Sequence, residues 1–270
     1  PEEIEGLPVR VIESGAFSGT GITKLVLGDT ITSVSFDELR ETLKSIRWTA
    51  GIPKVPHSQF QGFTALETVV LPEGVTDIGT DYRNSTTGSF RDCTSLKKIG
   101  LPQSLKVIGK YAFFNCHNLT ELVLPEKLET IDYDALYGTS IKELELPDSV
   151  TNVSVEGLNE SLTYIRWSAG CTRLSESQFK DFKVLQKVIL PEGVTQISDY
   201  PSLNSTGCFM NCVMLQSVTL PQSLAVIGDY AFKNCRSLKS IILPKNLTIL
   251  GTDAFSGCTE LDTITIPEKI

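Results

Sequence analysis

Cysteine and histidine are the residues in this sequence with the most versatile chemistry, since they can ligate metals, form disulfides or act in catalysis. The 270-residue chain holds seven cysteines and two histidines. Five of the cysteines recur at one position of a repeated pattern, namely Cys93, Cys116, Cys212, Cys235 and Cys258. We interpret them as small buried core residues. Disulfides between equivalent positions are disfavoured, because their Cβ atoms would stay about one repeat apart. Cys208 and Cys212, four residues apart, remain the alternative pair.

The sequence offers little else for catalysis or metal binding. His57 and His117 stand at variable positions that align with Glu176 and Arg236 in the second half of the chain. There is no H-E-x-x-H, G-x-S-x-G, Walker A or dinucleotide-binding motif. We therefore predict no metal site, no cofactor and no enzymatic activity. A hydrolase working in a groove is kept only as the weakest of three functional hypotheses.

Composition excludes two further classes of function. The chain has 24 Lys+Arg against 32 Asp+Glu and a net charge of −8, which counts against a nucleic-acid binder. No apolar run approaches the roughly 20 residues that span a bilayer. No signal peptide is visible, although the chain begins at Pro1 and a leader upstream is left open.

An internal repeat dominates the sequence. The 23-residue pattern L-x-x-I-x-L-P-x-x-L-x-x-I-G-x-x-A-F-x-x-C-x-x begins at Leu96, Leu215 and Leu238. The strand-end position of this pattern recurs at Leu27, Trp48, Leu71, Leu101, Leu124, Leu146, Trp167, Leu190, Leu220, Leu243 and Ile266. Residues 22–140 also align without a gap to residues 141–259, with 53 identities in 119 pairs. These spacings indicate about eleven coils and the duplication of a five-coil block.

Each coil combines three structural signals. L-x-x-I-x-L predicts a strand, which the following Pro ends because it cannot donate to a ladder. A shorter extended piece ends at I-G, where the Gly allows a turn. A-F-x-x-C then places Phe and Cys on one side of a single helical turn. One coil cannot close a core but stacked coils can, so we predict a single solenoid domain over residues 1–270.

These motifs resemble the bacterial BspA-like, or Treponema-type, leucine-rich repeats across essentially the whole chain. The resemblance implies an α/β repeat solenoid: a right-handed β/α superhelix with a parallel concave sheet, short convex strands and single-turn helices. Three departures stand out. Trp48 and Trp167 replace Leu, the coils at 49–71 and 168–190 read Ser-Gln-Phe in place of Ala-Phe, and two coils are 30 residues long.

A strip on the concave sheet is the first candidate binding surface. Residues that alternate outward from the buried strand positions would line it, and its candidate members are Arg47, Val70, Val123, Glu145, Tyr164, Arg166, Ile189 and Ile242. An exposed run of Val and Ile is unusual without a partner. The alternative is simple β-propensity, with Glu145 beside Arg166 as a structural cross-strand pair.

The extra residues of the two long coils are the second candidate surface. Residues 80–87 align with 199–206, and the candidate side chains are Tyr82, Arg83, Asn84, Tyr200, Pro201, Leu203 and Asn204. Insertions in repeat proteins map to loops on one face, which is often a binding face. The alternative is a tolerated surface insertion.

Function is predicted mainly by analogy with the family, whose members are mostly surface or secreted proteins and include adhesins. The leading hypothesis is a non-enzymatic bacterial cell-surface or secreted protein-binding or adhesion module. Its partner would be a protein or glycan, including one derived from a host. The alternative is a structural spacer within a larger surface protein.

Overall fold

The structure, a computed structural model, describes residues 3–4, 7–49, 53–79 and 87–266. The chain divides into two compact units, Pro1–Ser140 and Ile141–Ile270. This division falls where the second copy of the duplicated sequence begins. A single domain over residues 1–270 stays a prediction.

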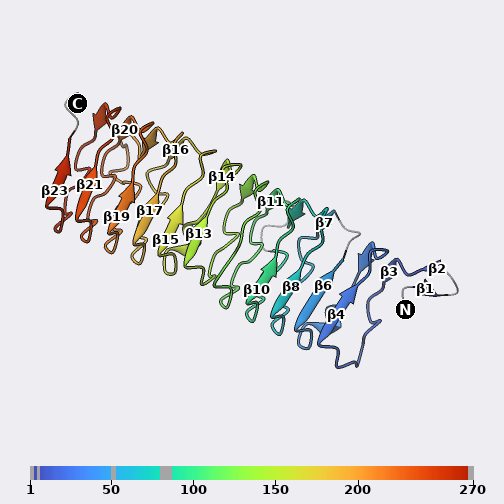
Figure 1. Ribbon diagram of the computed structural model, residues 1–270. Coiled ribbons are helices and arrows are strands. Elements are labelled where there is room, and N and C mark those ends of the chain that lie inside the picture. The colour runs from blue at the N-terminus through green and yellow to red at the C-terminus, as the bar shows by residue number, and fades with distance from the viewer. Residues whose placement is uncertain (1–2, 5–6, 50–52, 80–86, 267–270) are drawn as a thin grey trace. The chain divides into compact units, whose positions relative to one another are not determined.

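In the first unit, short parallel strands stack into two ladders (Figure 1). The long-strand ladder contains β4 (Lys24–Leu27), β6 (Ser45–Trp48), β8 (Thr68–Val70) and β10 (Lys98–Gly100), paired in chain order. The short-strand ladder contains β7 (Lys54–Val55), β9 (Asp77–Ile78), β11 (Val107–Ile108) and β12 (Thr130–Ile131). β3 (Val11–Ile12) pairs with β5 (Ser33–Val34), and β1 (Glu3–Ile4) forms an unpredicted antiparallel pair with β2 (Leu7–Pro8).

The second unit repeats this arrangement. Its long-strand ladder contains β13 (Glu143–Glu145), β15 (Tyr164–Arg166), β17 (Lys187–Ile189) and β19 (Ser217–Thr219), followed by the separate pair β21 (Ser240–Ile242) and β23 (Thr263–Thr265). Its short strands are β14 (Asn152–Val153), β16 (Arg173–Leu174), β18 (Gln196–Ile197), β20 (Val226–Ile227) and β22 (Ile249–Leu250). The predicted solenoid of about eleven coils with parallel strands is therefore confirmed.

The long-strand ladder is interrupted at the same point of both sequence copies. Residues 121–123, where the repeat predicts a strand, form none, and in the second copy β19 and β21 belong to different sheets. The residues that precede the two breaks differ, since Gly100 in one copy corresponds to Thr219 in the other. The residue type at this position therefore does not explain the break.

The A-F-x-x-C segments form tight turns, so the prediction of single-turn helices there was wrong. The helices in the described residues are two short 3-10 turns, η1 (Asp37–Leu39) and η2 (Glu156–Leu158). The residue before each Cys is left-handed, with φ of 60° at Asn115 and 62° at Asn234, which an α-helix cannot contain. Every second backbone N–H of the turn instead donates to a carbonyl oxygen of the next coil. For example, Phe113 N donates to Ala135 O at 2.8 Å.

Stacked phenylalanine rings fill the core of each unit. In the first unit Phe60, Phe90 and Phe113 stack with centroids 4.9 and 5.4 Å apart. In the second unit the stack consists of Phe179, Phe209, Phe232 and Phe255, with ring centroids 5.1, 5.1 and 5.2 Å apart. Because equivalent rings come from successive coils, each coil buries its ring against its neighbours and depends on them for its core.

The glycine of the I-G motif takes the predicted left-handed turn at Gly79, with φ of 70°, but has a different role at Gly109 and Gly228. Gly109 and Gly228 do not have positive φ, so neither supplies a left-handed turn. A Cβ built on Gly109 would overlap the carbonyl oxygen of Gly79 in the preceding coil, and one on Gly228 would overlap that of Asp199. Glycine is therefore required here by the close approach of neighbouring backbones.

Candidate functional site

In the first unit, the outward positions of the long-strand ladder form part of the candidate strip. Arg47 is in register with Val70 on the next strand, and both side chains are exposed, whereas the intervening Ile46 and Val69 are buried. Val123 is 84% exposed but lies in the segment that forms no strand. The structure thus brings Arg47 and Val70 together and leaves Val123 outside the hydrogen-bonded ladder.

In the second unit, three members of the strip are successive neighbours. Glu145 is in register with Arg166, and Arg166 with Ile189. Glu145 is exposed, whereas Arg166, Ile189 and Tyr164 are half-buried. Ile242 is exposed on β21, in the separate two-stranded sheet. This part of the strip is consequently more polar and less open than the part in the first unit.

The polar side chains of this strip bond differently from the predicted cross-strand pair. The Arg166 guanidinium bonds to Asp148 Oδ1 at 3.3 Å and to Leu146 O at 3.0 Å. Glu145 instead accepts a hydrogen bond from the Tyr164 hydroxyl at 3.2 Å. Burial, followed by the charge of Glu145, raises the pKa of Tyr164. Tyr164 is therefore a hydrogen-bond donor at neutral pH and holds Glu145 in place.

Hydrogen bonds of Ser202 and Asn204 fix the insertion loop of the second unit. Asn204 Nδ2 donates to Glu176 Oε1 at 2.6 Å, and Ser202 Oγ donates to Glu176 Oε2 at 3.1 Å. The hydrogen bond from Asn204 is the largest cause of a lowered pKa at Glu176. Ser202 N also donates to the buried Asp229, at 2.9 Å. These contacts hold the backbone of the loop against neighbouring coils.

Three candidate side chains of the same loop are exposed. Tyr200, Pro201 and Leu203 are exposed, and the Tyr200–Pro201 peptide bond is cis. The corresponding candidates of the first insertion, Tyr82, Arg83 and Asn84, lie outside the described residues. The loop at 199–206 therefore combines exposed apolar side chains with hydrogen-bonded residues on either side of Leu203.

Four of the five repeated cysteines are buried core residues, as predicted, whereas Cys258 is half-buried. All seven cysteines are free thiols, including Cys208 and Cys212. Each repeated thiol donates to a Phe carbonyl of the preceding coil, as Cys93 does to Phe60 at 3.0 Å and Cys116 to Phe90 at 3.1 Å. Burial raises the pKa of Cys93 to about 12. A thiol in this state is unreactive at neutral pH.

The histidines bond to backbone carbonyl groups. His57 Nδ1 lies 3.3 Å from Gly79 O, and His117 Nδ1 lies 2.8 Å from Gly138 O. The described residues contain no group of three or more His, Cys, Asp or Glu side chains that could hold a metal ion. None of the helices they form has the length and apolar character that a membrane crossing requires.

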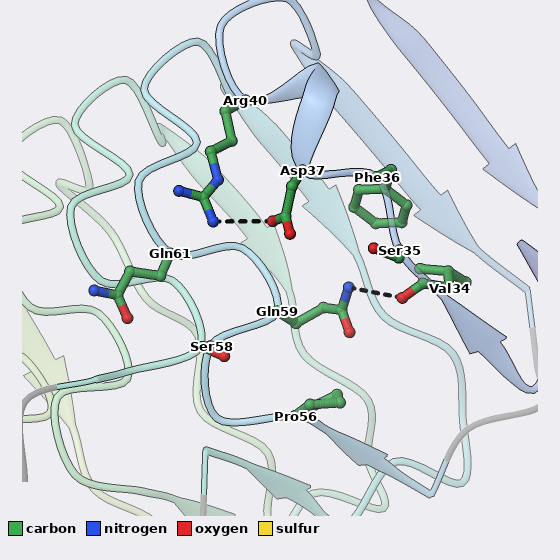
Figure 2. Close-up of a pocket in the computed structure, with 9 residues that line it drawn as sticks. All are labelled: Val34, Ser35, Phe36, Asp37, Arg40, Pro56, Ser58, Gln59 and Gln61. Atoms are coloured by element: carbon green, nitrogen blue, oxygen red, sulfur yellow. Dashed lines mark hydrogen bonds and ion pairs between the residues drawn. The ribbon is translucent and has the colours of Figure 1, made fainter. Parts of the chain in front are cut away.

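A polar hollow of about 420 Å³ lies in the first unit beside η1 (Figure 2). Its lining residues are Val34, Ser35, Phe36, Asp37, Arg40, Pro56, Ser58, Gln59 and Gln61. Arg40 pairs with Asp37 at 2.9 Å, and Gln59 Nε2 donates to Val34 O at 3.4 Å. Polar side chains thus line the hollow together with Val34, Phe36 and Pro56.

Sequence reasoning did not identify this hollow, although it contained the signal. Ser58-Gln59-Phe60 replaces the Ala-Phe of the repeat, which puts a long amide side chain where other coils have a buried methyl group. The second unit keeps Ser177-Gln178-Phe179, but Asn159 stands at the position equivalent to Arg40. The ion pair is thus specific to the first copy.

Comparison with known proteins identifies the repeat. The sequence matches the BspA-type leucine-rich repeat region, in six copies, over residues 7–87, 84–206 and 203–270. No curated protein matches the chain significantly. A solved leucine-rich repeat protein from Bacteroides ovatus ATCC 8483 is similar, with 24% identity and a TM-score of 0.51 over 97% of this chain and 78% of that one. TpLRR, a leucine-rich repeat protein of T. pallidum, has 22% identity and a TM-score of 0.52 over 76% of this chain and 91% of that one.

At these identities the two solved structures support the fold alone, and the family is shown by the sequence match. The matched repeats of this family extend over residues 7–270. They include the long-strand and short-strand ladders and the stacked phenylalanine rings described above. The chain therefore belongs to the BspA-type leucine-rich repeat family.

Proposed function

We propose that the chain is a non-enzymatic binding module of a bacterial surface or secreted protein, and that it holds a protein partner on the candidate strip. The observation that carries this proposal is the exposed apolar side chains on the long-strand ladders, at Val70 and Ile242, together with Val123. The strip thus leaves apolar side chains exposed to water in each unit, and exposed apolar surface is a feature of interaction sites.

The charged residues of the strip support recognition of a specific partner. Arg47 adjoins Val70 in the first unit, and Glu145 adjoins Arg166 in the second. Apolar anchors beside charged side chains are the usual composition of a protein interface, in which the charges select among partners more than they add affinity. The strip combines both kinds of group.

Alanine substitution tests the role of the strip. The variant Val70→Ala/Val123→Ala/Ile189→Ala/Ile242→Ala would be compared with the wild-type protein on a panel of immobilised host matrix proteins and on a glycan array. We expect a matrix protein that binds the wild type to bind this variant at least tenfold more weakly, because the apolar anchors are lost.

Val11→Ala is the matched control. Val11 is 48% exposed and lies on a short strand, whereas Val70 is 45% exposed and lies on the long-strand ladder. Equal binding by the four-residue variant would remove the strip from the proposal. Absence of any wild-type binding across the panel would favour the alternative, a spacer within a larger surface protein.

Placement at the cell surface or outside the cell is part of this proposal and is supported by the family resemblance. Fractionation of the source bacterium, followed by immunoblotting for this chain, tests it. Detection only in the cytoplasmic fraction would contradict the adhesion role.

A further inference from the structure

A cluster of aromatic and cationic side chains lies on the turn segments of the first unit, not on the candidate strip. We call it the aromatic–cationic cluster, and it consists of Arg91, Lys110, Tyr111, Phe114, Tyr133 and Tyr137. Tyr133 and Tyr137 are 49% and 46% exposed. Several large aromatic side chains thus meet at the surface rather than in the core.

One part of the cluster is a column of stacked side chains. The ring of Phe114 stacks on that of Tyr137, with centroids 5.0 Å apart and an interplanar angle of 11°. The Arg91 guanidinium carbon lies 4.4 Å from the centroid of Phe114. Because Arg91 lies one coil before Phe114 and Tyr137 one coil after, both faces of the Phe114 ring are covered.

The other part of the cluster surrounds Tyr111. Lys110 Nζ lies 5.0 Å from the ring centroid of Tyr111 and 5.3 Å from that of Tyr133. The Tyr111 ring meets Tyr133 and Phe114 edge to face. Cation–π contacts hold Lys110 and Arg91 in one geometry, so binding through them would lose little side-chain entropy.

The duplicated sequence does not require this cluster. The core residues Ala112, Phe113 and Cys116 have identical counterparts in the second copy. In contrast, only one of the six cluster positions is identical, since Tyr111 corresponds to Tyr230; the other five correspond to Met210, Asp229, Lys233, Thr252 and Ser256. The second copy therefore folds into the same coils without the aromatic surface, and packing of the repeat does not explain it.

We propose that the aromatic–cationic cluster is a second docking site, for a protein whose surface presents apolar side chains together with carboxylate or carbonyl oxygens. Tyr, Phe and Arg are enriched in protein interfaces, and Tyr and Arg recur among the residues that dominate binding energy. A guanidinium has five N–H donors, of which the Arg91 Nε–H faces Asp92 at 3.4 Å. Acceptor oxygens on the partner would complement the positive charges of Arg91 and Lys110.

The geometry favours a protein over a glycan. Sugar rings bind aromatic residues by stacking on an open ring face, but both faces of Phe114 are covered and Tyr111 carries two cations over its ring. The exposed ring edges of Tyr133 and Tyr137 suit contacts with side chains of a protein. The site is separate from the candidate strip and does not depend on the function proposed for it.

Peptide selection tests the inference. A phage library of random dodecapeptides would be selected on the immobilised wild-type protein, and the enriched peptides measured in solution by fluorescence polarisation. We expect peptides that combine aromatic or aliphatic residues with Asp or Glu. We expect Tyr133→Ala/Tyr137→Ala to weaken their binding at least tenfold, while Tyr133→Phe/Tyr137→Phe retains most of it because the rings remain.

The counterpart positions of the second copy provide the matched control. Thr252→Ala/Ser256→Ala, and the strip variant Val70→Ala/Val123→Ala, should bind the same peptides as the wild type does. Circular dichroism would establish that each variant is folded. No peptide enrichment, or equal binding by Tyr133→Ala/Tyr137→Ala, would overturn the proposal. Glycan-array binding that this variant loses, without peptide binding, would replace the protein partner with a glycan.

Discussion

At the scale of single residues, the turn of each coil depends on backbone conformations that few side chains adopt. The residue before the repeated Cys position has positive φ and is glycine, asparagine or aspartate in both copies, at Gly62, Asp92, Asn115, Gly138, Asp181, Asn211, Asn234 and Gly257. The amides and carboxylates among them also bond from coil to coil, as where Asn115 Nδ2 donates to Asp92 Oδ1 at 2.9 Å. One side chain therefore serves both the turn and the stacking of coils.

Substitution of Asn115 separates these two roles. We expect Asn115→Ala to lower the free energy of unfolding by about 1–3 kcal/mol, because alanine strains the left-handed backbone and the hydrogen bond is lost. Asn115→Gly loses the same hydrogen bond but tolerates positive φ, so its effect should be clearly smaller. Urea unfolding of the two variants measures the difference. Equal losses would show that backbone strain is not decisive at this position.

Gly109 tests the close approach of neighbouring coils. A Cβ at this position would overlap Gly79 O, so we expect Gly109→Ala to destabilise the protein by about 1–3 kcal/mol or more. Gly28→Ala is the matched control, because a Cβ there meets nothing within 4 Å and φ is not positive. Its effect should stay within about 0.5 kcal/mol. Thermal unfolding compares the two, and similar shifts would refute the steric argument.

At the scale of elements, the strands could be predicted but the turns could not. Alternating Leu and Ile positions report which face of a strand is buried, and all but one of the eleven expected strands form. A-F-x-x-C has the spacing of a helical turn, yet the left-handed residue within it, such as Asn115, is not visible as apolar periodicity. Residues 121–123 form no strand although their sequence follows the repeat like the others. The pattern alone therefore does not predict this exception.

The cysteine ladder makes stability depend on pH. Burial raises the pKa of Cys93 to about 12 and that of Cys116 well above its ordinary value. Below the unfolded pKa of about 8.5, both thiols are neutral in the folded and in the unfolded protein. Their contribution to the free energy of unfolding is therefore fully present in that pH range. Above it the unfolded thiols ionise first, and stability falls by about 1.4 kcal/mol per pH unit for each thiol until the folded pKa is reached.

The variant Cys93→Ser/Cys116→Ser isolates this effect. A serine hydroxyl can still donate to the Phe60 and Phe90 carbonyls but does not ionise in this range. We expect the free energy of urea unfolding to fall less steeply with pH above about 9 in the variant than in the wild type. All other titrating groups are shared, so parallel slopes would contradict the argument.

At the scale of the whole molecule, the sequence predicted candidate surfaces where the repeat pattern or its two insertions mark them. The outward positions of the strands follow from alternation, and the exposure of Val70 and Ile242 agrees with it. The aromatic–cationic cluster was missed because its members occupy variable positions in three coils. Its signal was the spacing of Arg91, Phe114 and Tyr137, each one 23-residue coil apart, which stacks unlike side chains into a column.

How far destabilisation spreads along the chain tests whether the predicted solenoid over residues 1–270 unfolds locally or as one cooperative domain. Phe113 and Phe232 occupy equivalent places in two separate ring stacks, one in each compact unit. Truncating a buried phenylalanine costs about 3–5 kcal/mol, and in a solenoid each coil contacts only its neighbours. We expect Phe113→Ala to reduce amide protection in the coils around residues 90–135 and to leave residues 209–255 protected. Phe232→Ala should give the reverse pattern by hydrogen-exchange mass spectrometry. A uniform loss of protection in both variants would instead show that the two units unfold as one cooperative domain.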